Sequence, residues 1–157
     1  MNAPAKTENR PELTIKRVFD APRELVYACW TQEEHMQKWF FPKDFTVPAT
    51  QSDIRPGGSY RSCLRAPDGT DYWVGGTYKE LSPPERIVFT HAWQDGAGNA
   101  EHETVVTITL KDLGDGRTQL TFHQAFFLSE ASRDGHETGW VESLDNLEVH
   151  LAREAAR

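Results

Sequence analysis

The sequence predicts an α+β fold: a curved antiparallel sheet of six to seven strands, two short helices and one long C-terminal helix. Three observations lead to this prediction. Apolar residues alternate with polar ones over 13–19, as in a half-buried strand. Further strand-like runs lie between turn signals such as Pro-Asp-Gly at 67–69 and Asp-Gly at 115–116. From about residue 132, the apolar spacing becomes that of an amphipathic helix.

Two short helices are expected directly after the first strand. Asp20 is placed to cap a helix whose first turn contains Pro22, where the missing N–H costs nothing. Thr31-Gln32-Glu33-Glu34 has the pattern of a capping box, so a second helix is expected to start there and to end before Pro42. Trp30 and Trp39 are interpreted as packing anchors of this pair.

The sequence predicts one domain preceded by a short polar tail. Residues 1–11 are polar and are expected to form a loose tail, and residues 12–157 are expected to form a single domain. The six later strands are predicted at 45–54, 59–66, 72–81, 86–93, 103–112 and 117–127. Pro48 lacks a ladder donor, which favours an edge strand. Seven strands are too many for one helix to cover unless the sheet curls, so a space is expected between sheet and helix.

The long helix is predicted from His136 to Arg153, with Gly135 and Gly139 weakening its start. Its apolar positions 140, 144, 147 and 151 share one face. This face would cover the sheet.

Composition excludes several partners. The chain has 157 residues, 38% of them hydrophobic, and 17 basic against 24 acidic residues give a net charge of −7. Nucleic acid and anionic membranes both require a clustered basic face, which this sequence lacks. Neither is expected as a partner, and a cytoplasmic location is expected. Cys29 and Cys63 are expected to be buried free thiols rather than a disulfide.

Strand alternation suggests which side chains point toward the expected space. The nine candidate ligand-binding residues are Phe89, His91, Val106, Ile108, Phe122, Gln124, Trp140, Leu144 and Leu147. On this interpretation His91 and Gln124 are polar groups in an apolar interior, the arrangement that orients a small organic ligand. The alternative for His91 is an inert, exposed position at the rim. No residue is assigned a catalytic role.

The other histidines give little evidence for a metal or cofactor, and neither is predicted. His91 and His102 lack an evident third ligand at a zinc-like spacing. His35, His136 and His150 fall on predicted helices, where solvated positions are expected.

The assembled blocks resemble the START-like superfamily, also called SRPBCC or the pollen-allergen-like helix-grip fold. Within it, the chain looks like the family related to the C-terminal domain of the heat-shock-protein-90 ATPase activator. The blocks are RVFDAPRELVY at 17–27, Trp30-Thr31 followed by Trp39, RPGG at 55–58, PDGT at 67–70, PPERIVFT at 83–90, and Gly139-Trp140 with Leu144 and Leu147. Where the family commonly has paired tryptophans and Gly-Pro, this chain has Trp39-Phe40-Phe41-Pro42, a difference that affects either a cavity mouth or its packing.

The resemblance implies a cavity for a small molecule beneath the C-terminal helix, but not one reaction. The favoured hypothesis is non-catalytic binding of a small hydrophobic or aromatic ligand, lipid-like or polyketide-like. A chaperone-associated interaction module, linked to stress response, is the second hypothesis, and a cyclase or dehydratase the third. A homodimer through the edge strands stays open.

Overall fold

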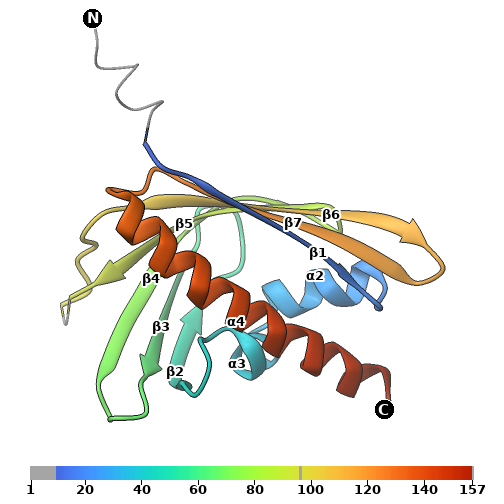
Figure 1. The fold of residues 1–157 in the computed structure, drawn as a ribbon, viewed down its shortest axis with the longest axis horizontal. Coiled ribbons are helices and arrows are strands. Elements are labelled where there is room, and N and C mark those ends of the chain that lie inside the picture. The colour runs from blue at the N-terminus through green and yellow to red at the C-terminus, as the bar shows by residue number, and fades with distance from the viewer. Residues whose placement is uncertain (1–9, 96, 157) are drawn as a thin grey trace, which may run out of the picture.

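The computed structural model describes residues 10–95 and 97–156, and these ranges contain seven strands and three helices (Figure 1). The elements are β1 (Leu13–Phe19), α2 (Arg23–Thr31), α3 (Glu33–Trp39), β2 (Thr46–Ser52), β3 (Ser59–Arg65), β4 (Asp71–Ser82), β5 (Arg86–Gln94), β6 (Thr104–Gly114), β7 (Arg117–Ala125) and α4 (Glu130–Ala155). The predicted helix-grip architecture is confirmed. The first nine residues of the predicted tail lie outside the described ranges.

The strands form one antiparallel sheet in the order β1-β7-β6-β5-β4-β3-β2. β1 pairs with β7, so the first strand lies beside the last, and β2 forms the opposite edge, as Pro48 predicted. In Figure 1, β2, β3 and β4 bend away from the flatter part of the sheet.

The pairing of β4 with β5 is irregular. The register shifts between Tyr78 and Glu80, as in a β-bulge. Nearby, a Cβ on Gly76 would lie 1.8 Å from the backbone oxygen of Thr90. Only glycine allows the two strands to approach so closely, so the sheet can bend there.

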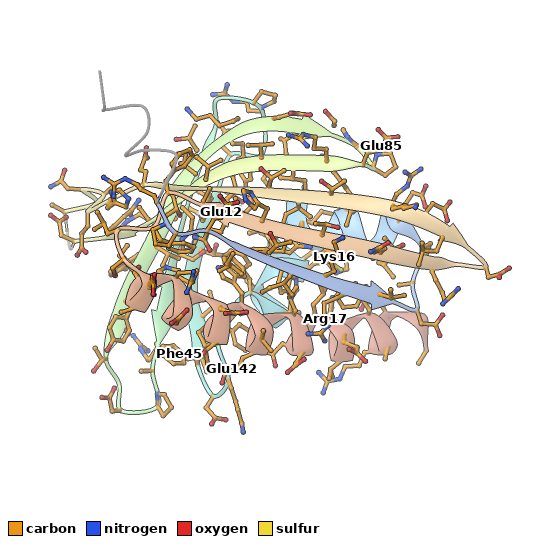
Figure 2. The ribbon with its side chains drawn as sticks, turned by 45° about the horizontal axis from the view of Figure 1, so that its top comes forward. Glu12, Lys16, Arg17, Phe45, Glu85 and Glu142 are labelled. Atoms are coloured by element: carbon orange, nitrogen blue, oxygen red, sulfur yellow. The ribbon has the colours of Figure 1, made fainter. Side chains whose placement is uncertain are left out.

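Helix α4 runs across the sheet (Figure 1) and starts earlier than predicted. The Ser129 hydroxyl accepts a hydrogen bond from the Ser132 backbone N–H at 3.1 Å and caps the helix. Two ion pairs connect the middle of α4 to β1: Arg17 donates to Asp145 at 2.9 Å and to Glu148 at 3.0 Å. Figure 2 labels Arg17. No helix within the described ranges is both long enough and apolar enough to cross a bilayer.

Both predicted caps of the short helices are wrong. Pro22, in extended backbone, occupies the N-cap of α2, so Asp20 is not the cap. Thr31 stays inside α2 as its last residue and donates to the Tyr27 carbonyl at 2.9 Å, so it cannot cap α3. The Glu33 carboxylate instead accepts hydrogen bonds from the Ser52 backbone N–H and hydroxyl, at 3.1 and 2.8 Å. These bonds connect α3 to the edge strand β2.

The two tryptophans of this region are packing anchors, as predicted. Trp30 and Trp39 are both buried and meet edge to face, with ring centroids 4.6 Å apart. The Trp39 indole N–H donates to the Cys29 carbonyl at 2.9 Å, so the ring also ties α3 to α2. Cys29 and Cys63 are buried and free, as expected.

Candidate functional site

A pocket of about 390 Å³ lies at one end of the space between α4 and the sheet. The N-terminal half of α4, strands β3 to β5 and the segment after α3 form its wall. The lining residues are Phe40, Phe41, Pro42, Leu64, Val74, His91, Trp93, Ala131, Ser132, Gly135, His136, Gly139, Trp140 and Ser143. Such a volume suits a small organic molecule.

Two glycines in α4 keep this part of the wall open. A Cβ on Gly135 would meet nothing within 4 Å, and one on Gly139 would come no closer than 3.9 Å to the Pro42 ring. The helix therefore presents bare backbone where a larger side chain would enter the space. The sequence signalled these positions only as weak helix formers.

His91 is a deeply buried polar side chain of the pocket, at 6% exposure. Among the described residues, none forms a hydrogen bond with its Nδ1 atom. Burial, with a smaller contribution from His136, lowers the pKa of His91 to about 3. The imidazole is therefore neutral at pH 7 and has a polar atom that lacks a protein partner. The exposed position considered for His91 is wrong, because the side chain is buried.

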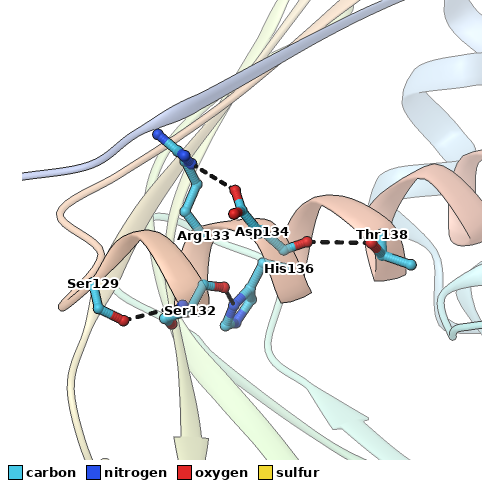
Figure 3. Close-up of polar contacts among 6 residues, drawn as sticks. All are labelled: Ser129, Ser132, Arg133, Asp134, His136 and Thr138. Carbon is cyan, nitrogen blue, oxygen red and sulfur yellow. Dashed lines mark hydrogen bonds and ion pairs between the residues drawn. The ribbon is translucent and has the colours of Figure 1, made fainter.

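His136 lies beside His91, with ring centroids 5.9 Å apart. Its Nδ1 is 2.8 Å from the Ser132 carbonyl oxygen (Figure 3). A carbonyl can only accept, so Nδ1 carries the proton, and Nε2 of the neutral ring is an acceptor. Burial lowers the pKa of His136, which favours this neutral form. The predicted solvated position is wrong, because the first turns of α4 turn His136 toward the pocket.

Of the nine candidate residues, His91 and Trp140 line this pocket. Phe89 lines a second void of only about 10 Å³. The other six are fully buried in the core between the sheet and the middle of α4; they are Val106, Ile108, Phe122, Gln124, Leu144 and Leu147. Side chains interlock there, as the 4.6 Å separation of the Phe122 and Trp140 rings illustrates. A ligand contact by any of these six residues stays a prediction.

Both ends of the Gln124 amide are bonded within the protein. Its amide oxygen accepts from the Trp140 indole N–H at 2.8 Å, and its amide nitrogen donates to the Thr104 hydroxyl at 2.8 Å. The Thr104 hydroxyl in turn donates to the His91 carbonyl at 2.8 Å. Gln124 therefore holds Trp140 in place in the pocket wall.

The remaining histidines lie elsewhere. His102 bonds the Phe126 carbonyl at 2.6 Å, and His123 lies 2.6 Å from Glu12. His35 and His150 face each other between α3 and α4 at 2.8 Å, and His150 is only 7% exposed. The solvated position predicted for His150 is therefore wrong, because helix packing turns it toward the interior, whereas His35 is half-buried.

The pocket residues that sequence reasoning missed come mainly from two short segments. The Phe40-Phe41-Pro42 segment forms one side, at the place where the chain departs from the pattern of the family it resembles. The first turns of α4 form another side, before the predicted start of the helix.

A protein-family model matches residues 20–152, and its description is activator of Hsp90 ATPase homolog 1-like protein. The chain belongs to this family. The resemblance noted in the sequence is thereby confirmed, together with its START-like fold.

Solved structures of bacterial proteins share the family fold over nearly the whole chain. A family member from Silicibacter pomeroyi is 26% identical with a TM-score of 0.82, and the match covers 92% of this chain and 99% of that one. A protein from Chromobacterium violaceum is 29% identical with a TM-score of 0.78, covering 89% and 96%. One from Nitrosomonas europaea is 26% identical with a TM-score of 0.79, covering 93% and 97%. No curated protein matches the chain.

Proposed function

We propose that this chain binds one small hydrophobic or aromatic molecule, lipid-like or polyketide-like, in the pocket under the N-terminal half of α4. The observation that carries the proposal is an apolar pocket with a buried polar atom, Nδ1 of His91, that has no protein partner. Leaving such an atom unpaired costs about 1–3 kcal/mol, which a ligand hydrogen bond would recover. Burying about 200 Å² of apolar ligand surface would add roughly 5 kcal/mol before association costs.

The two imidazoles favour a ligand with a polar hydrogen. Nε2 of neutral His136 is an acceptor, and neutral His91 has one accepting nitrogen. A phenol, an amine or an alcohol attached to an apolar body would match them. A carboxylate would not, since neither ring carries a positive charge at pH 7.

Binding without catalysis fits the chemistry of His91 better than the cyclase or dehydratase alternative. A general base works best when its pKa lies near the working pH. The pKa of His91, about 3, makes it a weak base at pH 7. Its role in the proposal is therefore to orient the ligand.

The proposal is tested by titrating the protein with N-phenyl-1-naphthylamine, a neutral fluorescent probe with one N–H donor. In the Gly139→Leu variant the new side chain starts 3.9 Å from Pro42 and enters the pocket. We expect its Kd to rise about tenfold or more, a loss of about 1.4 kcal/mol.

Gly139→Ala is the matched control, because its methyl group makes only ordinary van der Waals contact with Pro42. It should bind the probe nearly as wild type does. Equal binding by wild type and Gly139→Leu would refute the proposed site. A probe in which an ether oxygen replaces the N–H should bind more weakly to wild type if the imidazoles accept from the ligand.

The family description favours a second candidate, an interaction module that stimulates a chaperone ATPase. The test is the ATPase rate of purified Hsp90 with a molar excess of this protein. An unchanged rate would remove this candidate.

A cytoplasmic location and a homodimer through the edges of the sheet remain proposals; light scattering on a sizing column tests the latter.

A further inference from the structure

Three metal-ligating side chains from three different helices meet outside the pocket wall. They are Cys29 of α2, His35 of α3 and His150 of α4. The Cys29 sulfur and one nitrogen of each imidazole all lie within 4.8 Å of one another. His35 Nδ1 and His150 Nε2 are 2.8 Å apart.

This donor set has the chemistry of a zinc site. Thiolate sulfur and imidazole nitrogen are the ligands that structural zinc sites use most, in a tetrahedral arrangement. Carboxylate-only clusters would instead suit calcium or magnesium. We propose that Cys29, His35 and His150 bind one zinc ion that joins α2, α3 and α4.

Small side-chain movements would complete the geometry. With zinc–nitrogen bonds of about 2.0–2.1 Å, two tetrahedral ligands lie about 3.3 Å apart, so the 2.8 Å gap between His35 and His150 must open by about 0.5 Å. With a zinc–sulfur bond of about 2.3 Å, sulfur and nitrogen lie about 3.6 Å apart, against the 4.8 Å upper limit here.

Glu154 is the candidate fourth ligand. It follows His150 by four positions in α4 and therefore lies on the same side of the helix. Its charge acts on both the Cys29 thiol and the His150 ring. It also offsets the positive charges of Lys38 and Arg153, which act on His150.

The proton balance of binding is simple. Without metal, one imidazole of the facing pair donates its N–H to the other, and burial raises the pKa of the Cys29 thiol, which keeps its proton. Zinc would bind the two facing nitrogens, and the donated proton would move to the other nitrogen of the same ring. The thiol proton would leave to solvent, one per ion bound. His35 is half-buried, so it offers a route for the ion and the proton.

The test is a titration of the metal-free full-length protein with cobalt(II), followed by zinc(II). We expect a thiolate-to-cobalt charge-transfer band in the near ultraviolet, and the intense visible bands of a tetrahedral ion. Both should saturate at one ion per chain and disappear when zinc displaces cobalt. A titration without these bands, or with the weak bands of an octahedral ion, would overturn the proposal.

Variants locate the site. Cys29→Ser should abolish the charge-transfer band, whereas Cys63→Ser, which removes the other buried thiol, should leave it unchanged. His35→Gln changes only a half-buried residue and gives an answer even if Cys29→Ser does not fold. Its cobalt affinity should fall by at least the 10–100-fold that loss of an outer partner of a metal ligand costs. Full binding by Cys29→Ser or His35→Gln would overturn the proposal. Unchanged probe binding in both variants would show that the metal site is independent of the pocket.

Discussion

Gln124 shows how one buried polar residue holds three elements together. It is fully buried, yet both ends of its amide are bonded, to Trp140 of α4 and to Thr104 at the start of β6. A buried polar group contributes to stability only when its partners are all present. The Trp140 indole, and with it the pocket wall, therefore depends on this amide.

We predict that Gln124→Leu lowers the free energy of unfolding by about 2–3 kcal/mol, because the buried indole N–H of Trp140 loses its acceptor. Urea denaturation measures the change. The control is Gln119→Leu, the same substitution on the opposite face of β7, which should stay within about 0.5 kcal/mol of wild type. Equal effects of the two substitutions would contradict this account of Gln124.

His91 makes stability depend on pH. Its pKa is about 3 in the folded protein and near 6.5 when unfolded, so between these values only the unfolded chain takes up the proton. The contribution of neutral His91 to the free energy of unfolding is therefore fully present above about pH 6.5 and is lost as the pH falls toward 3. The slope of about 1.4 kcal/mol per pH unit gives a loss of roughly 2–3 kcal/mol between about pH 6.5 and pH 4.5.

The measurement is urea denaturation of wild type and His91→Leu at these two pH values. We expect the variant to lose about 2 kcal/mol less than wild type on acidification. His136, whose pKa burial also lowers, keeps some acid dependence in both proteins. The same acid loss in both proteins would show that His91 does not stay neutral.

At the scale of the element, α4 contains two glycines that destabilise the helix but leave room for the pocket. Glycine in a helix interior costs up to about 1 kcal/mol relative to alanine. Gly135 and Gly139 lie one turn apart and both line the pocket. The Ser129 cap helps the first turns form despite these residues.

We predict that Gly135→Ala raises the free energy of unfolding by about 0.5–1 kcal/mol, because its Cβ meets nothing within 4 Å. Thermal denaturation measures this gain. Gly76→Ala is the contrasting variant: its Cβ would lie 1.8 Å from the Thr90 oxygen, so it should destabilise the protein. A lower melting temperature for Gly135→Ala than for wild type would contradict this account of Gly135.

At the scale of the whole molecule, α4 connects two separate regions. Its N-terminal half forms the pocket wall, and its C-terminal half carries His150 toward α2 and α3. Between them, the tightly packed core around Leu144 and Leu147 separates the two sites. If both proposals hold, a substitution in one site should therefore leave the other intact.

We predict that Gly139→Leu loses probe binding but still binds cobalt with its thiolate band. His35→Gln should show the reverse, with weak cobalt binding and a wild-type Kd for the probe. Fluorescence and absorption titrations of the two variants measure both properties. Loss of both properties in either variant would show that α4 couples the two sites.

The order and type of the elements follow from the sequence by itself. Strand and helix periods are local, so the alternation over 13–19 and the spacing of Trp140, Leu144 and Leu147 indicate structure without any knowledge of neighbours. Turn residues are equally local, and the predicted strands accordingly differ from the observed ones by only a few residues at their ends. The helix caps were wrong because Pro22 takes the N-cap of α2 and the Thr31 hydroxyl bonds the Tyr27 carbonyl inside α2.

The tertiary structure alone decides where the hollow lies and which polar groups face it. Alternation identifies the inward side of each strand, but not where a bent sheet separates from its helix. From the sequence, Gln124 and His91 were therefore both expected to face the cavity. The bend and two bare glycines leave His91 beside open space, whereas packing encloses Gln124. Likewise, His35 and His150 are 115 positions apart and meet only because α3 packs against α4. Such proximity depends on the path of the whole chain, which no local pattern encodes.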